Sequence, residues 1–404
     1  MEVGNELCEF IKNCPTPFQF VQHASQILLD AGYTKLYEKK DWDPTITKGF
    51  VLREERSLIA FNIGGYESGI IVGTHCDSPV LRLRKSFINQ KPKVSCTTKS
   101  KEYGWFMSQT WKDRPLRLAG CVVTKNDRII PFDSIDPVAV MPHELDDPIY
   151  GISKDTTSLL NYVCDKLKIK KMDVKKHELS FVDANPPKLI GANKDFVASQ
   201  RIDNLSSTFS ALKAFLNSKP NKTVNVLVVF DYEEVGSEEP TGAEGDFLSK
   251  ILHKILNKFN KKEFNAFIAR SLVVSNDNGH AVHPNYSSRH DEMHAPKMGE
   301  GIVLKMSPCG LYATDLTSSY PLIKAAEVAN VPIQKMINRN DIESSTTIGP
   351  IVSSNLGIAT VDIGLPQLAM HSIREIVAIK DVEYNVKLLI ELYNRYDDYR
   401  LKNI

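Results

Sequence analysis

Acidic and imidazole side chains stand beside short apolar segments at several places in this sequence. The runs IIVGT, VLVVFDY and LVVSN each lead directly into such residues, and others lie in QRIDNL and QLAMHSIRE. Together these segments supply seven candidates: His75, Asp77, Asp203, Glu233, Glu234, Asp277 and His371. Because ligands collect beyond the carboxyl ends of strands in open α/β sheets, we expect these side chains to share one crevice. Two imidazoles and several carboxylates, without a set of thiolates, suit a divalent ion such as Zn²⁺, Mn²⁺ or Co²⁺.

The spacing of these residues indicates how they could divide the chemistry. A single carboxylate can bridge two ions through its two oxygens. Of the adjacent pair Glu233 and Glu234, one can bind metal while the other handles protons, because neighbouring residues at a strand end point in different directions. Asp77 lies two residues from His75 and can therefore orient its imidazole.

Each of these residues, taken singly, also fits an ordinary structural role. The glutamate pair could be solvated, Asp203 could cap a helix, and His371 could be a core or capping histidine. The combination favours a metal site, because carboxylates beside buried strands are costly unless a positive charge lies among them.

The segments that must position these residues are typical of an α/β protein. Short segments rich in β-branched residues predict strands at Ser57–Ile63, Gly69–Thr74, Val224–Phe230, Ala266–Ser275 and Gly301–Lys305. Helical periodicity covers Glu6–Ala31 (interrupted at Pro15–Pro17), Leu205–Leu216, Asp246–Phe259 and Asp381–Tyr396. Strands that alternate with helices predict a mixed sheet with helices on its faces.

The middle third of the chain has a different pattern of residue types. Short β-like pieces at Leu116–Val123 and Arg128–Phe132 alternate with prolines and lysine-rich turns, and one helical stretch covers Ser158–Leu167. We therefore predict that residues 85–189 form a smaller, β-rich inserted domain, and that residues 1–84 and 190–404 form a discontinuous catalytic domain.

Composition excludes several classes of protein. The 404 residues are 42% hydrophobic and 25% charged with a net charge of +1, as in ordinary globular proteins, so no basic excess argues for nucleic acid. The longest apolar run, Val224–Phe230, is too short to span a bilayer. The start MEVGNELCEF is unlike a secretory signal, and seven scattered cysteines without a CxxC pair favour reduced thiols. We expect a cytoplasmic protein.

Other motifs carry less chemistry. The loop GHAVHPNYSSRHDEMH could be a second metal site, a substrate loop or a solvated connection, and we favour a substrate loop with His283 as its candidate contact. Cys76 is interpreted as a packing residue. The sequence contains neither a Gly-x-Ser-x-Gly elbow nor a GxxxxGK[ST] loop, which excludes the usual signatures of serine hydrolases and P-loop proteins.

At these residues the chain resembles the M18 family of metallo-aminopeptidases, and most closely its aspartyl aminopeptidase branch. Eight blocks in the family's order carry the resemblance: CPTPFQFV, THCDSPVLRLR, WKDRPLRLAG, QRIDNL, DYEEVGS, DNGHAVHPNY, TTIGPI and GLPQLAMHSIRE. The resemblance implies an α/β catalytic domain interrupted by a β-rich domain that makes dimer and substrate contacts. It also implies dimers that assemble into a tetrahedral dodecamer with the active sites facing an internal chamber. Some relatives are vacuolar, so vesicular delivery is a second location to consider.

The resemblance assigns a role to each candidate residue. His75 and Asp277 would bind one zinc ion, Glu234 and His371 the other, and Asp203 would bridge both. Asp77 would support His75. Glu233 would be the general base for a metal-bound water that attacks the carbonyl of the N-terminal residue of a peptide with a free amino group.

Three departures from the family pattern concern substrate binding. In DPVAVMPHEL, His143 is the match for a histidine that helps bind substrate across the dimer. Lys305 and Tyr312 keep their places near the expected side-chain pocket, but Leu311 stands where the family has arginine. The turn YGWFMSQTW is also altered. A preference for N-terminal Asp or Glu needs a nearby cation, which Lys305 could supply.

Two rival functions stay open. Another dinuclear zinc hydrolase, a carboxypeptidase or amino-acid deacylase, could use the same ions and would accept a peptide with a blocked amino group. A scaffold protein without catalysis would be expected to lose a ligand or the base, whereas this chain keeps all of them.

Overall fold

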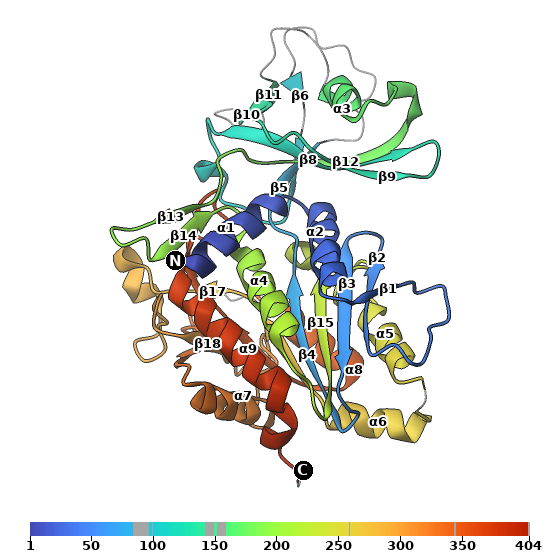
Figure 1. Cartoon of the computed structure of the whole chain (residues 1–404). Coiled ribbons are helices and arrows are strands. Elements are labelled where there is room, and N and C mark those ends of the chain that lie inside the picture. Colours follow the sequence, from blue (N-terminus) through green and yellow to red (C-terminus); the bar gives the residue numbers. More distant parts are fainter. Residues whose placement is uncertain are drawn as a thin grey trace.

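A nine-stranded mixed sheet forms the centre of the larger part of the molecule (Figure 1). The computed structural model describes residues 1–83, 97–98, 100–141, 149–151, 159–257, 259–342 and 345–402. In spatial order the strands are β1 (Thr34–Leu36), β2 (Lys48–Arg53), β3 (Ser57–Ile63), β15 (Thr223–Phe230), β4 (Ser68–His75), β16 (Leu272–Asn276), β20 (Ala359–Gly364), β18 (Ile302–Lys305) and β19 (Ile333–Met336). The four central strands β15, β4, β16 and β20 run parallel, so their carboxyl ends lie at one edge.

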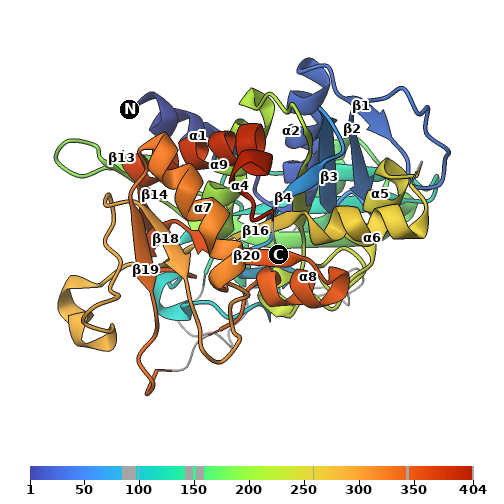
Figure 2. The same cartoon turned by 90° about the horizontal axis from the view of Figure 1, so that it is seen from below.

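Helices cover both faces of this sheet, because its central strands are buried on both sides. In β15, Val226 and Val228 pack into one apolar cluster, and Leu227 and Val229 pack into the other. The cluster with Leu227 and Val229 lies under α1 (Glu2–Asn13), α2 (Pro17–Asp30), α4 (Ile202–Asn217), α7 (Leu316–Ala329) and α9 (Ile379–Tyr399). The cluster with Val226 and Val228 lies on the opposite face of the sheet, under α5 (Phe247–Ile255), α6 (Lys261–Ala269) and α8 (Ile348–Leu356) (Figure 2). The predicted α/β fold with a mixed, helix-flanked sheet is confirmed.

A second sheet, drawn at the top of Figure 1, contains the long antiparallel pair β8 (Pro115–Thr124) and β12 (Val174–Asp183). Its other strands are β5 (Val80–Leu83), β6 (Thr97–Thr98), β7 (Ser100–Tyr103), β9 (Ile129–Asp133), β10 (Ala139–Val140) and β11 (Ile149–Gly151). With α3 (Leu159–Leu167) it encloses an apolar cluster that includes the fully buried Trp111. The predicted domain boundaries at residues 85 and 189 stay a prediction. Strand β5 falls within the predicted catalytic domain, but it pairs with β12 in this second sheet.

A third sheet of five short strands packs beside the central one. Its order is β13 (Lys188–Ile190), β14 (Phe196–Ser199), β22 (Glu375–Ala378), β21 (Pro366–Leu368) and β17 (Gly279–His280). Strands β14 and β22 pair antiparallel, so segments far apart in the sequence lie side by side.

Most predicted elements form within a few residues of the expected places, with one clear error. The predicted strand Ala266–Ser275 is wrong in its first half, because Ala266 lies in helix α6 and strand β16 begins only at Leu272. Asn260 starts this helix with a capping box: its side chain accepts the N–H of Glu263, and the Glu263 carboxylate accepts the N–H of Asn260. Among the described residues, no helix combines the length and apolar character needed to cross a bilayer.

Candidate metal centre

Three neighbouring parallel strands deliver candidate residues to one edge of the central sheet. His75 is the last residue of β4, Asp277 directly follows β16, and a 3₁₀ turn at Glu233–Val235 follows β15. Because β4 lies between β15 and β16, these side chains meet at the carboxyl edge of the sheet. The sequence predicts the two glutamates at the strand end itself, whereas the turn places them just beyond it.

The remaining candidates come from the third sheet. Asp203 lies in the first turn of α4, shortly after β14, and His371 lies in the turn between β21 and β22. Since β14 pairs with β22, both residues are brought to the edge where His75 lies. Asp203 does not cap its helix through its side chain, so the capping role considered for it is not the one it fills.

Tight backbone turns direct these side chains inward. Arg201, Tyr232 and His371 have φ angles of 66°, 64° and 64°, in the left-handed region that residues other than glycine rarely adopt. Such conformations cost about 1–3 kcal/mol each and persist where the surrounding structure enforces them. Each of the three is, or lies within two residues of, a candidate site residue.

Asp203 faces both imidazoles. One of its oxygens, Oδ1, lies 3.5 Å from Nε2 of His75, and the other, Oδ2, lies 3.3 Å from Nε2 of His371. Asp277 Oδ1 completes the first group at 3.4 Å from His75 Nε2, and Glu234 Oε2 completes the second at 3.2 Å from His371 Nε2. The potential ligand atoms of each group lie within 4.8 Å of one another. The geometry is that of two adjacent three-residue sites with a shared carboxylate.

Glu233 lies at the side of the first group. Its Oε2 is 3.8 Å from His75 Nε2, and its side chain keeps 15% of its exposure, compared with 5% for Glu234. A third potential ligand group joins His75 with both glutamates, so position alone does not separate their roles. The greater exposure of Glu233 leaves it the better placed of the two to exchange protons with a bound molecule.

Asp77 is buried and holds His75 in place. His75 Nδ1 lies 3.1 Å from the carbonyl oxygen of Asp77 and 3.3 Å from its Oδ1. The Tyr103 hydroxyl donates to Asp77 Oδ2 at 2.8 Å, and the backbone N–H groups of Glu233 and Glu234 donate at 3.2 and 3.1 Å. One carboxylate therefore connects the end of β4 to the turn after β15, and it fixes the orientation of the imidazole.

The protonation equilibria show an excess of negative charge in the cluster. Burial raises the pKa of Glu234 to about 7 and that of Glu233 well above its usual range. Burial alone would lower the pKa of His371, but the charges of Glu234 and Asp203 raise it to about 12. The two glutamates and His371 thus hold protons more tightly than they would in water. Burial would raise the pKa of Asp203 as well, but the two imidazoles that it faces lower it.

The donor set fits divalent metal ions. Within the described part of the chain, Asp203 Oδ1 and Glu234 Oε1 are buried yet accept no hydrogen bond. Buried carboxylate oxygens are normally satisfied, and a cation between the side chains would satisfy both. Imidazole nitrogens with carboxylate oxygens are ligands typical of zinc.

A cavity of about 480 Å³ opens onto this cluster. Its lining includes Glu233, His280, Lys305, Tyr312 and Trp105. The Trp105 ring is largely exposed, and its centroid lies 6.2 Å from that of the His371 imidazole. The cavity beside the cluster is therefore lined by aromatic and cationic side chains as well as by carboxylates.

Two of the predicted substrate residues lie in this cavity. Lys305 is buried, and its Nζ lies 3.5 Å from Asp277 Oδ2 and 5.5 Å from the centre of the Tyr312 ring. Although burial would lower the pKa of Lys305, the charge of Asp277 raises it, so the ammonium stays charged.

Of the other two predicted substrate residues, His283 does not line the described part of the cavity. His283 accepts the N–H of Asn285 through Nδ1 and packs against Tyr286, so the histidine of that loop that faces the cavity is His280. His143 lies outside the described residues. The roles of both stay predictions.

Glu375 is a residue that sequence reasoning missed. Its buried carboxylate accepts the backbone N–H of Asp203 at 2.9 Å and that of His371 at 2.7 Å. It thereby ties together the two turns that carry candidate ligands. The only signal in the sequence is its place four residues after His371, in the same block.

Comparison with known proteins agrees with this geometry. A family model described as aminopeptidase I zinc metalloprotease (M18) matches residues 10–146 and 133–393. The chain belongs to the M18 aminopeptidase family. An M18 relative from Stutzerimonas stutzeri (strain A1501), named probable M18 family aminopeptidase 2, is 36% identical over 432 residues, which cover 97% of this chain and 98% of the relative.

Solved M18 structures share the fold. The chain superposes on Ape4 from a complex of Ape4 and Nbr1 with a TM-score of 0.91 and 31% identity, over 99% of this chain and 88% of that one. A chain of the S. cerevisiae mApe1 dodecamer gives a TM-score of 0.89 at 24% identity, over 98% of both chains. The predicted M18 resemblance is therefore confirmed, and zinc is the metal that the family description names.

Proposed function

We propose that this chain is a dinuclear-zinc aminopeptidase that removes the N-terminal residue from peptides. The observation that carries the proposal is the shared carboxylate: Asp203 turns one oxygen toward the group with His75 and the other toward the group with His371. In this assignment His75, Asp203 and Asp277 hold one ion. Asp203, Glu234 and His371 hold the other.

Bound there, two zinc ions would lower the pKa of a coordinated water toward about 7 and polarise the scissile carbonyl. The chain's own residues handle the protons. Glu233 accepts the proton of the attacking water and returns it to the amine that leaves, because its carboxylate lies beside the first group and stays partly exposed. Asp77 keeps His75 oriented throughout, because its other contacts hold it rigidly.

We further propose a preference for an acidic N-terminal residue. Among the described residues that line the cavity, Lys305 is the only lysine or arginine, and it lies beside the proposed metal ligand Asp277. A substrate carboxylate near the Lys305 ammonium would gain a charge-assisted hydrogen bond in a largely buried setting. Leu311 lines a neighbouring pocket and adds no charge.

The test is a panel of aminoacyl fluorogenic substrates assayed with added Zn²⁺, Mn²⁺ and Co²⁺, with an N-acetylated peptide as the control. An aminopeptidase should cleave free amino termini, Asp and Glu fastest, and leave the blocked peptide intact. Cleavage of the blocked peptide would instead identify a deacylase or carboxypeptidase and overturn the proposal. A Lys305→Met variant should lose the acidic preference while it still cleaves neutral residues.

We also propose that the chains assemble into dimers and then into a tetrahedral dodecamer, in which the closed chamber admits only peptides and unfolded segments. Support comes from the S. cerevisiae relative, which is a dodecamer, and from the end-to-end match of the fold. We place the protein in the cytoplasm, with vesicular delivery to a vacuole as the alternative that imaging of a tagged chain would reveal.

A further inference from the structure

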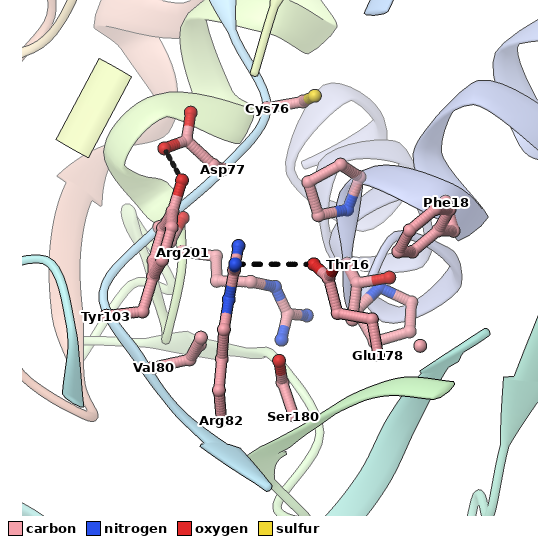
Figure 3. Close-up of a pocket in the computed structure, with 14 residues that line it drawn as sticks. Thr16, Phe18, Cys76, Asp77, Val80, Arg82, Tyr103, Glu178, Ser180 and Arg201 are labelled. Carbon is pink, nitrogen blue, oxygen red and sulfur yellow. Dashed lines mark hydrogen bonds and ion pairs between the residues drawn. The ribbon is translucent and has the colours of Figure 1, made fainter. Parts of the chain in front are cut away.

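A second, much smaller pocket lies beside the metal centre. Of the candidate site residues only Asp77 lines it, and its other walls include Thr16, Arg82, Ser180 and Arg201 (Figure 3). Its volume of about 20 Å³ exceeds the roughly 10–15 Å³ that one water molecule needs. The pocket therefore has room for a single ligand of about the size of one atom.

Arg201 points into this pocket with unused hydrogen-bond donors. The residue is only 4% exposed, and its Nη2 donates to the carbonyl oxygen of Ile11 at 2.9 Å. Its Nε and Nη1 have no hydrogen-bond partner among the residues that the structure describes. Figure 3 shows its guanidinium reaching between the walls, with the Ser180 hydroxyl directed toward it.

The carboxylates on the pocket wall are already paired with other groups. Glu178 forms ion pairs with Arg56 and, at 3.4 Å, with Arg82. Asp77 accepts hydrogen bonds from Tyr103 and two backbone N–H groups, as described above. Neither is free to neutralise the guanidinium of Arg201.

The acidic residues on the other side of Arg201 are also paired. Asp133 lies 3.1 Å from Nη1 of Arg117, and Asp183 lies 3.2 Å from Nη2 of Arg374. Arg117 itself adds a positive charge close to Arg201. Arg201 is thus a buried cation whose neighbouring carboxylates are paired with other groups.

Burial of an unpaired charge is costly, and the cost falls when a counter-ion occupies the same site. A water molecule would satisfy one or two N–H groups but would leave the charge uncompensated. Sulfate and phosphate are too large for a pocket with room for one atom. We propose that this pocket binds one monatomic, monovalent anion such as chloride, held by the Nε and Nη1 groups of Arg201.

The proposed ion would support the metal centre without touching it. Arg201 precedes Asp203 by two residues, and the carbonyl oxygen of Asp203 accepts the Ser78 hydroxyl at 2.8 Å, another group on the pocket wall. An anion on Arg201 would fix the turn that presents the shared carboxylate. We therefore expect its effect in the stability of the folded chain.

Crystals of the full-length protein grown in bromide give the direct test. An anomalous peak beside Nε and Nη1 of Arg201 is expected. If the position refines as water in crystals where bromide occupies sites elsewhere on the protein, the proposal is overturned.

Thermal unfolding shows whether the ion belongs to the folded protein. At constant ionic strength, chloride that replaces gluconate should raise the unfolding temperature in a saturable way, because a ligand that binds only the folded state stabilises it by mass action. An anomalous peak without this saturable rise would mean an adventitious ion only, and would overturn the proposal.

Variants show whether the effect of chloride on the unfolding temperature depends on Arg201. Arg201→Gln should abolish the chloride response, whereas Arg395→Gln, at an exposed arginine of α9 outside the pocket, should keep it. Ser180→Asp places a carboxylate of the chain itself near the Arg201 guanidinium, so the unfolding temperature of this variant should not depend on chloride. This variant tests the proposal even if Arg201→Gln does not fold. A full chloride response in Ser180→Asp would contradict the assignment.

Discussion

At the scale of the residue, Asp203 belongs both to the group with His75 and Asp277 and to the group with Glu234 and His371. Its replacement should therefore affect both proposed ions, whereas loss of any other ligand should affect one. We expect Asp203→Ala to contain almost no zinc after dialysis and Glu234→Gln to keep one ion per chain. Elemental analysis against protein concentration measures both, and two retained ions in Asp203→Ala would exclude a bridging role.

Glu233 should behave differently from its neighbour. Glu233→Gln keeps the shape of the side chain but cannot accept a proton, so turnover should fall by about 10²–10⁴-fold while metal content stays near that of the unchanged protein. Steady-state kinetics on a dipeptide substrate, paired with elemental analysis, separate the two effects. Glu234→Gln is the matched control because it should lose an ion. Unchanged turnover in Glu233→Gln would mean that another group is the base.

The sequence predicted which residues would converge but not every residue that positions them. His75, Glu233 and Asp277 could be found because they lie at or just beyond the ends of strands that are recognisable from their apolar composition. Glu375 could not, because it acts on backbone N–H groups, which leave no pattern in residue types. The choice between His280 and His283 depends on the direction of a loop, which local side-chain contacts set.

At the scale of the element, the two turns that carry the proposed ligands Asp203 and His371 are joined through Glu375. Glu375→Ala would free the N–H groups of Asp203 and His371 and loosen both turns. Loss of such a supporting contact commonly costs about 10–100-fold in metal affinity. Competition with a chromophoric chelator measures that affinity, and Glu300→Gln, at an exposed glutamate, is the control. Equal affinities in both variants would show that the turns hold their shape without Glu375.

The boundaries of elements were predictable where composition and capping agreed. The strand over Val224–Phe230 could be recognised because a strand buried on both faces is apolar at nearly every position, here all but Asn225. The strand expected at Ala266–Ser275 was misplaced because the apolar residues of α6 and β16 follow one another with only a short turn between them. The sequence NKKE, which forms the capping box at Asn260, was the signal that could have separated the two.

At the scale of the whole molecule, the proposed dodecamer fixes an expected mass. Light scattering coupled to size-exclusion chromatography should give about twelve times the 45.4 kDa of one chain. A mass that stays at one or two chains across protein concentrations would contradict the assembly, though not the metal chemistry. Assembly is the property that the sequence predicts least directly, because it depends on how surfaces of separate copies fit together.

The donors of the proposed metal centre come from β4, α4, the turn after β15, the end of β16 and the turn before β22, so they span the chain from His75 to His371. A ribosome must therefore synthesise most of the polypeptide before the last donor can take its place. If the proposed assignment holds, nascent chains and fragments cut between these segments would not hydrolyse peptides, because activity would begin only when a complete copy has folded.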